Sequence, residues 1–146
     1  MNDKRITVGL VELPEVSLLD GLGSNRAPVR PGNTLVSKQV LMASLEAGGF
    51  DVRLYNLKGG ESVDAFGEVN WKGLKLTKVM VGKDHRTVSP TECDVWGVTS
   101  NFSQHRNVAG IIMRHLRSGG RPVICGGSDA IAEPRTYLEG GADVVV

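Results

Sequence analysis

The chain has only two cysteines among its 146 residues, and their spacing matches no metal-binding motif. Structural zinc sites and iron–sulfur clusters use CxxC or CxxxCxxC patterns, which Cys93 and Cys125 do not form. Both residues lie at or within short apolar stretches, which favours two buried thiols over a disulfide. We therefore expect no zinc ion and no iron–sulfur cluster on this chain alone, and no metal ligand is assigned to it.

The sequence also has no excess of one charge and no long apolar run. A formal net charge of +1 does not supply the basic surface that nucleic-acid binding requires. The apolar run at 6–11 is too short for a signal-peptide core or a membrane span. These absences predict no nucleic-acid partner, no membrane span and a cytoplasmic location.

The common nucleotide-binding motifs are missing too. There is no GxxxxGK[ST] loop, and the first strand is followed by Leu13 and Pro14 instead of GxGxxG. A receiver domain needs paired acidic residues after its first strand and an aspartate after its third, but the chain has Glu12 alone and Ser100. A flavodoxin-type phosphate loop, rich in serine and threonine, is also absent after the first strand.

The apolar pattern that is present alternates between strand and helix periods. Strands are expected at 6–13, 51–57, 94–99, 121–125 and 142–146, and helices at 34–47, at 103–118 and at 134–139. Strands separated by helices require right-handed crossovers and a parallel sheet. The fold class is therefore α/β, a flavodoxin-like (Rossmann-like) five-stranded parallel sheet in the order 2-1-3-4-5 with helices on both faces.

Helical spacing predicts which faces of the two longer helices are buried. The apolar positions of the first helix are Val36, Val40, Ala43 and Ala47. The second helix is expected to be capped by Ser103, with a buried face of Val108, Ile111, Ile112 and His115 or Leu116.

The segment 58–92 is expected to be an irregular insert in a single domain that spans 1–146. The lysines at 72, 75, 78 and 83 within it indicate a solvated face more than a phosphate site. Its apolar residues at 74, 76, 79 and 81 fit either a short extra hairpin or a poorly formed second helix, and both alternatives stay open. Because the chain ends on a strand-like DVVV, we expect it to be the excised N-terminal domain of a longer enzyme.

Small and polar residues follow three of the expected strands. In a parallel sheet the carboxyl ends of adjacent strands line the crevice where ligands bind. Glycines let a bulky group approach the backbone, and hydroxyl and amide side chains can bind its polar edges. The candidate binding residues are Leu13, Pro14, Thr99, Ser100, Asn101, Phe102, Gly126, Gly127 and Ser128.

The second half of the chain follows an ordered pattern: GVTSN at 97–101, a helix, PVICGG at 122–127, a short helix from Pro134, and GADVVV at 141–146. This order resembles the N-terminal cobalamin-binding domain of cobalamin-dependent radical SAM enzymes, well over 94–146 and loosely over 5–57. In cobalamin domains a serine after the third strand and a glycine pair after the fourth line the slot for the nucleotide tail. The resemblance implies that Ser100, Gly126 and Gly127 do so here.

The chain departs from methionine synthase and the mutases, in which a DxHxxG loop after the first strand supplies a histidine to cobalt. The corresponding loop here, 13–33, contains no histidine. His85, His105 and His115 lie elsewhere, and each is expected to be a surface or packing residue. The resemblance therefore implies cobalamin bound with its tail displaced and without a protein histidine on cobalt.

Two classes of function follow. The first is a cobalamin-binding module of a radical SAM enzyme, a methyltransferase, with SAM and the four-iron four-sulfur cluster on a downstream domain of the same polypeptide. In that case this chain is non-catalytic, and its role is to position the corrin. The alternative is a non-cobalamin flavodoxin-like docking or regulatory domain.

Overall fold

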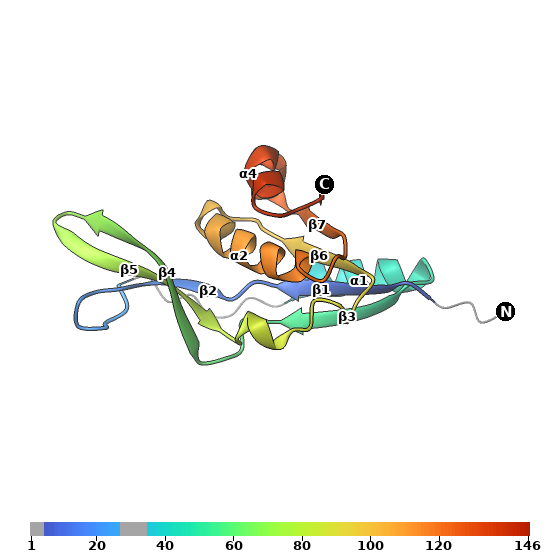
Figure 1. The fold of residues 1–146 in the computed structure, drawn as a ribbon, viewed down its shortest axis with the longest axis horizontal. Helices are drawn as coiled ribbons and strands as arrows, with labels where there is room; N and C mark the ends of the chain where they lie inside the picture. Colours follow the sequence, from blue (N-terminus) through green and yellow to red (C-terminus); the bar gives the residue numbers. More distant parts are fainter. Residues whose placement is uncertain (1–4, 27–34) are drawn as a thin grey trace.

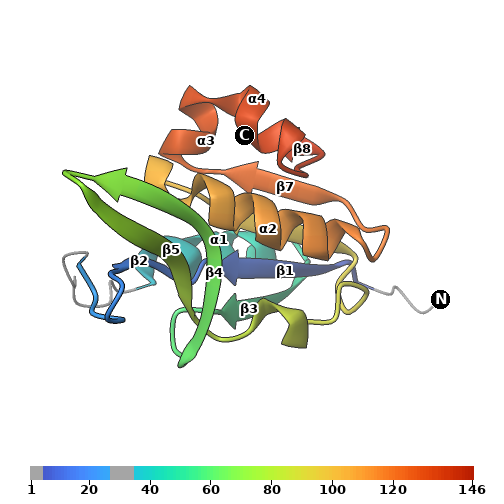
Figure 2. The ribbon, with the colours of Figure 1, turned by 60° about the vertical axis from the view of Figure 1, so that its left-hand side comes forward.

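The computed structural model describes residues 5–26 and 35–146. Its main feature is a parallel sheet of five strands in the order β3-β1-β6-β7-β8 (Figures 1 and 2). The strands are β1 (Thr7–Glu12), β3 (Asp51–Asn56), β6 (Val95–Thr99), β7 (Val123–Gly126) and β8 (Val144–Val145). Numbered along the chain, these five strands have the order 2-1-3-4-5, which confirms the predicted α/β fold.

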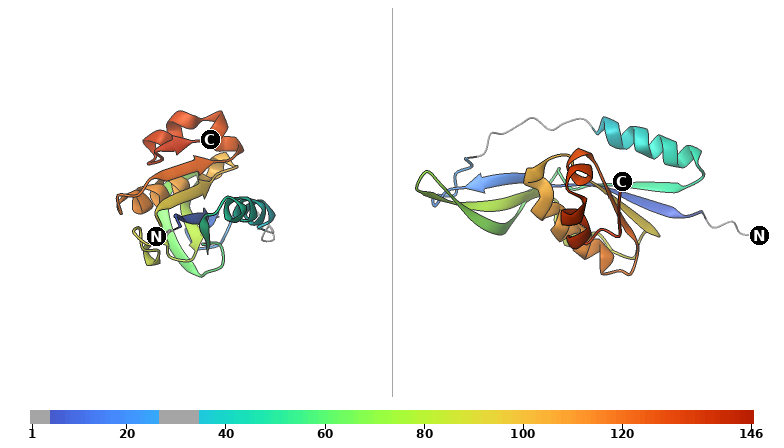
Figure 3. Two further views of the ribbon diagram at one scale, coloured as in Figure 1. Left: turned by 90° about the vertical axis from the view of Figure 1, so that its right-hand side faces the viewer. Right: turned by 90° about the horizontal axis from the view of Figure 1, so that it is seen from above.

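Helices lie on both faces of this sheet (Figure 3). One face carries α1 (Val36–Ala47), and the other carries α2 (Arg106–Arg117). Two short helices, α3 (Ser128–Ala132) and α4 (Pro134–Glu139), connect β7 to β8, and α4 begins at the predicted proline. The largest hydrophobic core forms on the α2 side, where Trp96, Val98 and Val108 are almost completely buried.

The segment expected to be irregular instead contains a long hairpin. Its strands β4 (Ser62–Trp71) and β5 (Leu74–Gly82) pair with β2 (Glu15–Leu19) as an antiparallel sheet in the order β2-β5-β4, which we call the wing. Of the two alternatives for 58–92, the hairpin is the one that forms. Leu13 and Pro14 carry the chain directly from β1 into β2, so the wing extends from the carboxyl edge of the parallel sheet (Figure 1).

The predicted buried face of α1 is wrong. Val36 and Val40 are 55% and 62% exposed, and Ala43 and Ala47 are exposed as well. The helix buries Lys38 instead, because this lysine forms an ion pair with Glu12 at the end of β1. Helical periodicity among apolar residues alone could not find a face that is oriented by a buried ion pair.

The second helix is largely as predicted. Val108, Ile112 and Leu116 are almost completely buried, whereas Ile111 and His115 are partly buried. Ser103 does not cap this helix: it begins a short 3-10 turn, η2 (Ser103–His105), and its hydroxyl makes no capping hydrogen bond. The chain therefore reaches α2 through one extra turn at the carboxyl edge of the sheet.

Both cysteines are free and buried in the core, as expected from the sequence. Burial raises the pKa of the Cys125 thiol to about 11, so this sulfur is a protonated packing group at neutral pH. Among the described residues, no helix has the length and apolar character needed to cross a membrane.

Candidate functional site

The structure brings the three predicted loops to one edge of the sheet. The loops that begin at Leu13, at Ser100 and at Gly127 follow β1, β6 and β7, and β6 pairs with both of its neighbours. The carboxyl ends of all three strands therefore point the same way, toward the wing (Figure 2). The side chains on the two faces of this edge differ in their burial and in their hydrogen bonds.

On the α2 face, the Ser100 side chain is buried and its hydroxyl is hydrogen-bonded. Ser100 is completely buried, and its Oγ lies 2.8 Å from the Tyr137 hydroxyl. Tyr137 donates its own proton to Asp129 at 2.6 Å, so the bond between the two hydroxyls must be donated by Ser100. Arg106 closes the chain with two bonds to the Asp129 carboxylate, at 2.7 and 2.8 Å.

The electrostatics of this chain of hydrogen bonds are consistent with its geometry. The Arg106 guanidinium lowers the pKa of Asp129 to about 2, so its carboxylate is ionised throughout the neutral range. Burial, together with the bond to Asp129, raises the pKa of Tyr137 to about 12 and keeps its hydroxyl protonated. We call these four residues, Ser100, Tyr137, Asp129 and Arg106, the loop lock, because they tie the loop after β6 to α2, α3 and α4.

The loops after β6 and β7 are also bonded directly to each other. Asn101 Oδ1 accepts a bond from the Ser128 amide at 3.1 Å, and the Ser128 hydroxyl donates to the Asn101 carbonyl at 3.1 Å. Gly127 has a φ of +112°, and a Cβ placed on it would lie 2.5 Å from the Ser100 carbonyl oxygen. Ser100, Asn101, Gly127 and Ser128 therefore hold the loops together, and the polar groups of Asn101 and Ser128 bind one another.

The opposite face of the same strands is open. Thr99 pairs with Gly126 across β6 and β7, and alternation places both on the face opposite Ser100. Within the described residues, the Thr99 hydroxyl makes no hydrogen bond. The one longer helix on this face, α1, packs against β3, whereas Val144 on β8 is 47% exposed. Thr99 and Gly126 are only partly buried by the described residues, and we call these two positions the glycine strip. Gly97 lies on the same face but is covered, because a Cβ on it would lie 2.8 Å from Leu10 Cδ2.

Sequence reasoning missed a cluster of charged residues at the end of β1. Glu12 is buried, and it forms ion pairs with Lys38 and, at 3.2 Å, with Lys58. Lys58 also reaches Glu15 at 3.4 Å, so two positive and two negative charges balance. The available signal was the spacing of Lys38, Met42 and Leu45, which are the less exposed positions of α1.

The three histidines lie in packed or ion-paired surroundings. His105 follows the Thr99 loop, its Nε2 is buried without a partner, and burial lowers its pKa so that the ring is neutral at neutral pH. His115 Nε2 lies 2.8 Å from the Val88 carbonyl, and its ring packs edge-on against His85 at 5.3 Å.

His85 also lies close to two carboxylates. Its ligand atoms and those of Asp64 and Asp84 are within 4.8 Å of one another. However, Arg86 forms ion pairs with both carboxylates, at 3.2 Å with Asp64 and 2.7 Å with Asp84. The group is therefore a network of ion pairs between the hairpin and the turn that follows it.

The chain matches no model of a known protein family and no curated protein. The assignment of its function therefore rests on its own residues and geometry.

The two neighbouring glycines should respond differently to substitution. We expect Gly127→Val to lower the free energy of unfolding by about 3 kcal/mol or more, because valine is strained at positive φ and overlaps Ser100. Gly126→Val should cost about 1 kcal/mol or less, because its nearest neighbours, in Val146, lie 3.4 Å from the added Cβ. Urea denaturation measures both changes, and equal losses would contradict this assignment.

The loop lock predicts a specific acid response. The pKa of Asp129 falls from 3.8 to about 2 on folding, so its contribution to stability is complete above the unfolded value and is lost as the pH falls through the folded value. Asp129→Asn should therefore lower the urea midpoint at pH 7 and remove part of the decline between pH 4 and pH 2. Glu139→Gln, at an exposed carboxylate, is the control. A variant that keeps the full wild-type acid response would exclude this role for Asp129.

Proposed function

We propose that this chain is the cobalamin-binding module of a radical SAM enzyme, with the glycine strip as the surface that receives the cofactor. The observation that carries the proposal is the pairing of Thr99 with Gly126 on a face that the described residues only partly bury, at the carboxyl edge of a 2-1-3-4-5 sheet. Ligands of open parallel sheets bind at this edge. An extended polar group requires both a bare backbone and a free donor, and the strip has both.

The residues of the glycine strip fit the nucleotide tail of cobalamin better than the bonded loops after β6 and β7 do. Gly126 has no side chain to occupy the space above the sheet, and the Thr99 hydroxyl makes no hydrogen bond to any described residue, so it can bind a polar edge. The resemblance implies that Ser100 and Gly127 line the slot, but the Ser100 hydroxyl is bound within the loop lock and Gly127 packs against the Ser100 carbonyl. In this proposal Thr99 takes the hydroxyl role that the sequence assigns to Ser100.

The residues of this chain would bind and orient the cofactor, and they would not take part in bond-making. Cobalamin, when bound, supplies the cobalt centre that carries a methyl group. Asn101 and Phe102 lie at the edge on which the corrin would rest, and Phe102 is 51% exposed there, whereas Leu13 and Pro14 are buried. The loop lock would keep this edge rigid while the cofactor binds.

SAM and the four-iron four-sulfur cluster belong, in this proposal, to a separate domain of the same polypeptide. A radical SAM cluster needs three cysteine thiolates, and the two cysteines here are buried core residues. The methyltransferase activity of the parent enzyme is part of the same proposal.

One observation favours the second candidate, a docking module without cobalamin. Val36, Val40 and Leu41 on α1 are all at least 42% exposed, on the same face as the glycine strip. Exposed apolar groups that lie together mark surfaces for protein contact. A partner domain on this face would exclude the cofactor, so a cobalamin titration separates the two functions.

The test is a titration of the purified chain with hydroxocobalamin, followed by absorbance and calorimetry. We expect a dissociation constant of about 10 μM, since a neighbouring domain that encloses the corrin would tighten it further. Gly126→Val should weaken binding at least about tenfold by filling the strip, and Thr99→Val should weaken it about fivefold by removing one hydrogen bond. No interaction up to millimolar cobalamin would reject the proposal in favour of the docking module.

A matched control is available in an exposed loop. Gly21 has no neighbour within 4 Å of an added Cβ, so Gly21→Val should leave cobalamin binding unchanged. Circular dichroism confirms that each variant is folded. Unchanged affinity in a folded Gly126→Val protein would place the cofactor away from the glycine strip.

A further inference from the structure

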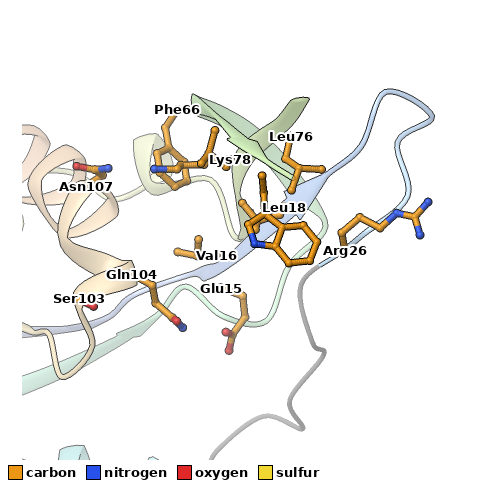
Figure 4. A pocket seen from close by; sticks show the side chains of 12 residues that line it. Glu15, Val16, Leu18, Arg26, Phe66, Leu76, Lys78, Ser103, Gln104 and Asn107 are labelled. Carbon is orange, nitrogen blue, oxygen red and sulfur yellow. The ribbon is translucent and has the colours of Figure 1, made fainter. Parts of the chain in front are cut away.

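A pocket of about 600 Å³ lies between the wing and the start of α2 (Figure 4). Its volume is in the range of small-molecule sites. The floor is apolar and comes from all three strands of the wing. The residues that form it are Val16, Leu18, Phe66, Val69, Trp71 and Leu76.

Local strand geometry explains the aromatic character of this floor. The register of β4 against β5 shifts between Ala65 and Gly67, which leaves Phe66 as the extra residue of a β-bulge. The bulge adds the Phe66 ring to the face that already holds Val69 and Trp71. An aromatic ring can therefore pack between rings contributed by one edge strand.

A single unpaired cation lies within this apolar floor. Lys78 on β5 forms no ion pair within the part of the chain that the structure describes. The other charged residues of the lining are neutralised, because Arg26 pairs with Asp20 and Glu15 pairs with Lys58. Figure 4 shows the Lys78 ammonium directed toward the α2 side of the pocket.

The opposite wall also favours a negative charge. Ser103, Gln104 and Asn107 line it, and none of the three makes a side-chain hydrogen bond to any described residue. The first turn of α2 contains no acidic residue, and no side chain of a described residue caps it, so an anion can approach its positive dipole end from the pocket side. Three donors and a helix terminus therefore face the lysine across an apolar floor.

We propose that this pocket binds a small aromatic anion, with its ring on the Phe66 side of the floor and its acidic group between Lys78 and the start of α2. The proposal does not depend on cobalamin, because none of the residues that carry it belongs to the glycine strip. The apolar floor binds the aromatic ring of the ligand, and the Lys78 ammonium binds its negative charge.

The probe is 8-anilinonaphthalene-1-sulfonate, and its uncharged counterpart is N-phenyl-1-naphthylamine. Fluorescence titration of the wild-type chain should give a dissociation constant about tenfold lower for the anion, as one charge-assisted contact predicts. Equal affinity for the two compounds in the wild-type protein would overturn the proposal without any variant.

Variants then test whether Lys78 binds the negative charge of the probe. Lys78→Met keeps the apolar stem, and it should weaken binding of the anion about tenfold while changing the neutral compound less than about twofold. Lys75→Met is the matched control, since Lys75 is on the same strand but pairs with Glu68 at 3.0 Å, and it should change neither. Phe66→Ala should weaken both compounds. An equal effect of Lys75→Met and Lys78→Met would show that the anion binds a general positive surface, and the proposal would fail.

Discussion

The chain of hydrogen bonds from Ser100 to Arg106 determines which parts of this protein can receive a ligand. It links the end of β6 to three helices through Tyr137 and Asp129, and it is buried at its Ser100 end. A buried hydroxyl without a partner is costly, so a chain in which every member is satisfied favours one arrangement of the loops. Because the loop lock consumes the polar groups of the α2 face, the free donors of the carboxyl edge are left on the other face and beside the wing.

Buried polar groups are also paired with one another at the end of β1. Glu12 and Lys38 are both buried, and such a pair adds little net stability because each charge loses its hydration. What the pair does provide is orientation, because it fixes which side of α1 faces the sheet. The apolar stripe of α1 is turned outward as a result, on the same side of the sheet as α1 itself. One ion pair therefore exposes an apolar surface that the sequence alone would have placed in the core.

Most of the architecture could be predicted from the sequence, because it follows from alternating strand and helix periods and from turn residues. The five parallel strands, their order and the helix at Pro134 were all predicted, since each depends on local pattern and on a general rule of handedness. The hairpin at 62–82 could not be chosen over a helix, because its apolar residues fit both periods. The face of α1 was mispredicted for a different reason: its anchor is a lysine, whose partner lies on a strand far away in the sequence.

At the candidate site, too, some features could be predicted from the sequence and others could not. The sequence correctly indicated that loops after β1, β6 and β7 would meet, because this follows from strand order. It could not distinguish Thr99 from Ser100, since neighbouring residues of a strand point to opposite faces and the sequence does not show which face is covered. That distinction depends on Tyr137, which arrives from α4, and on Gly127, whose positive φ brings the next loop against Ser100. Two adjacent hydroxyls thus acquire different chemistry: one becomes part of the fold, and the other binds no described residue on a partly exposed face of the sheet.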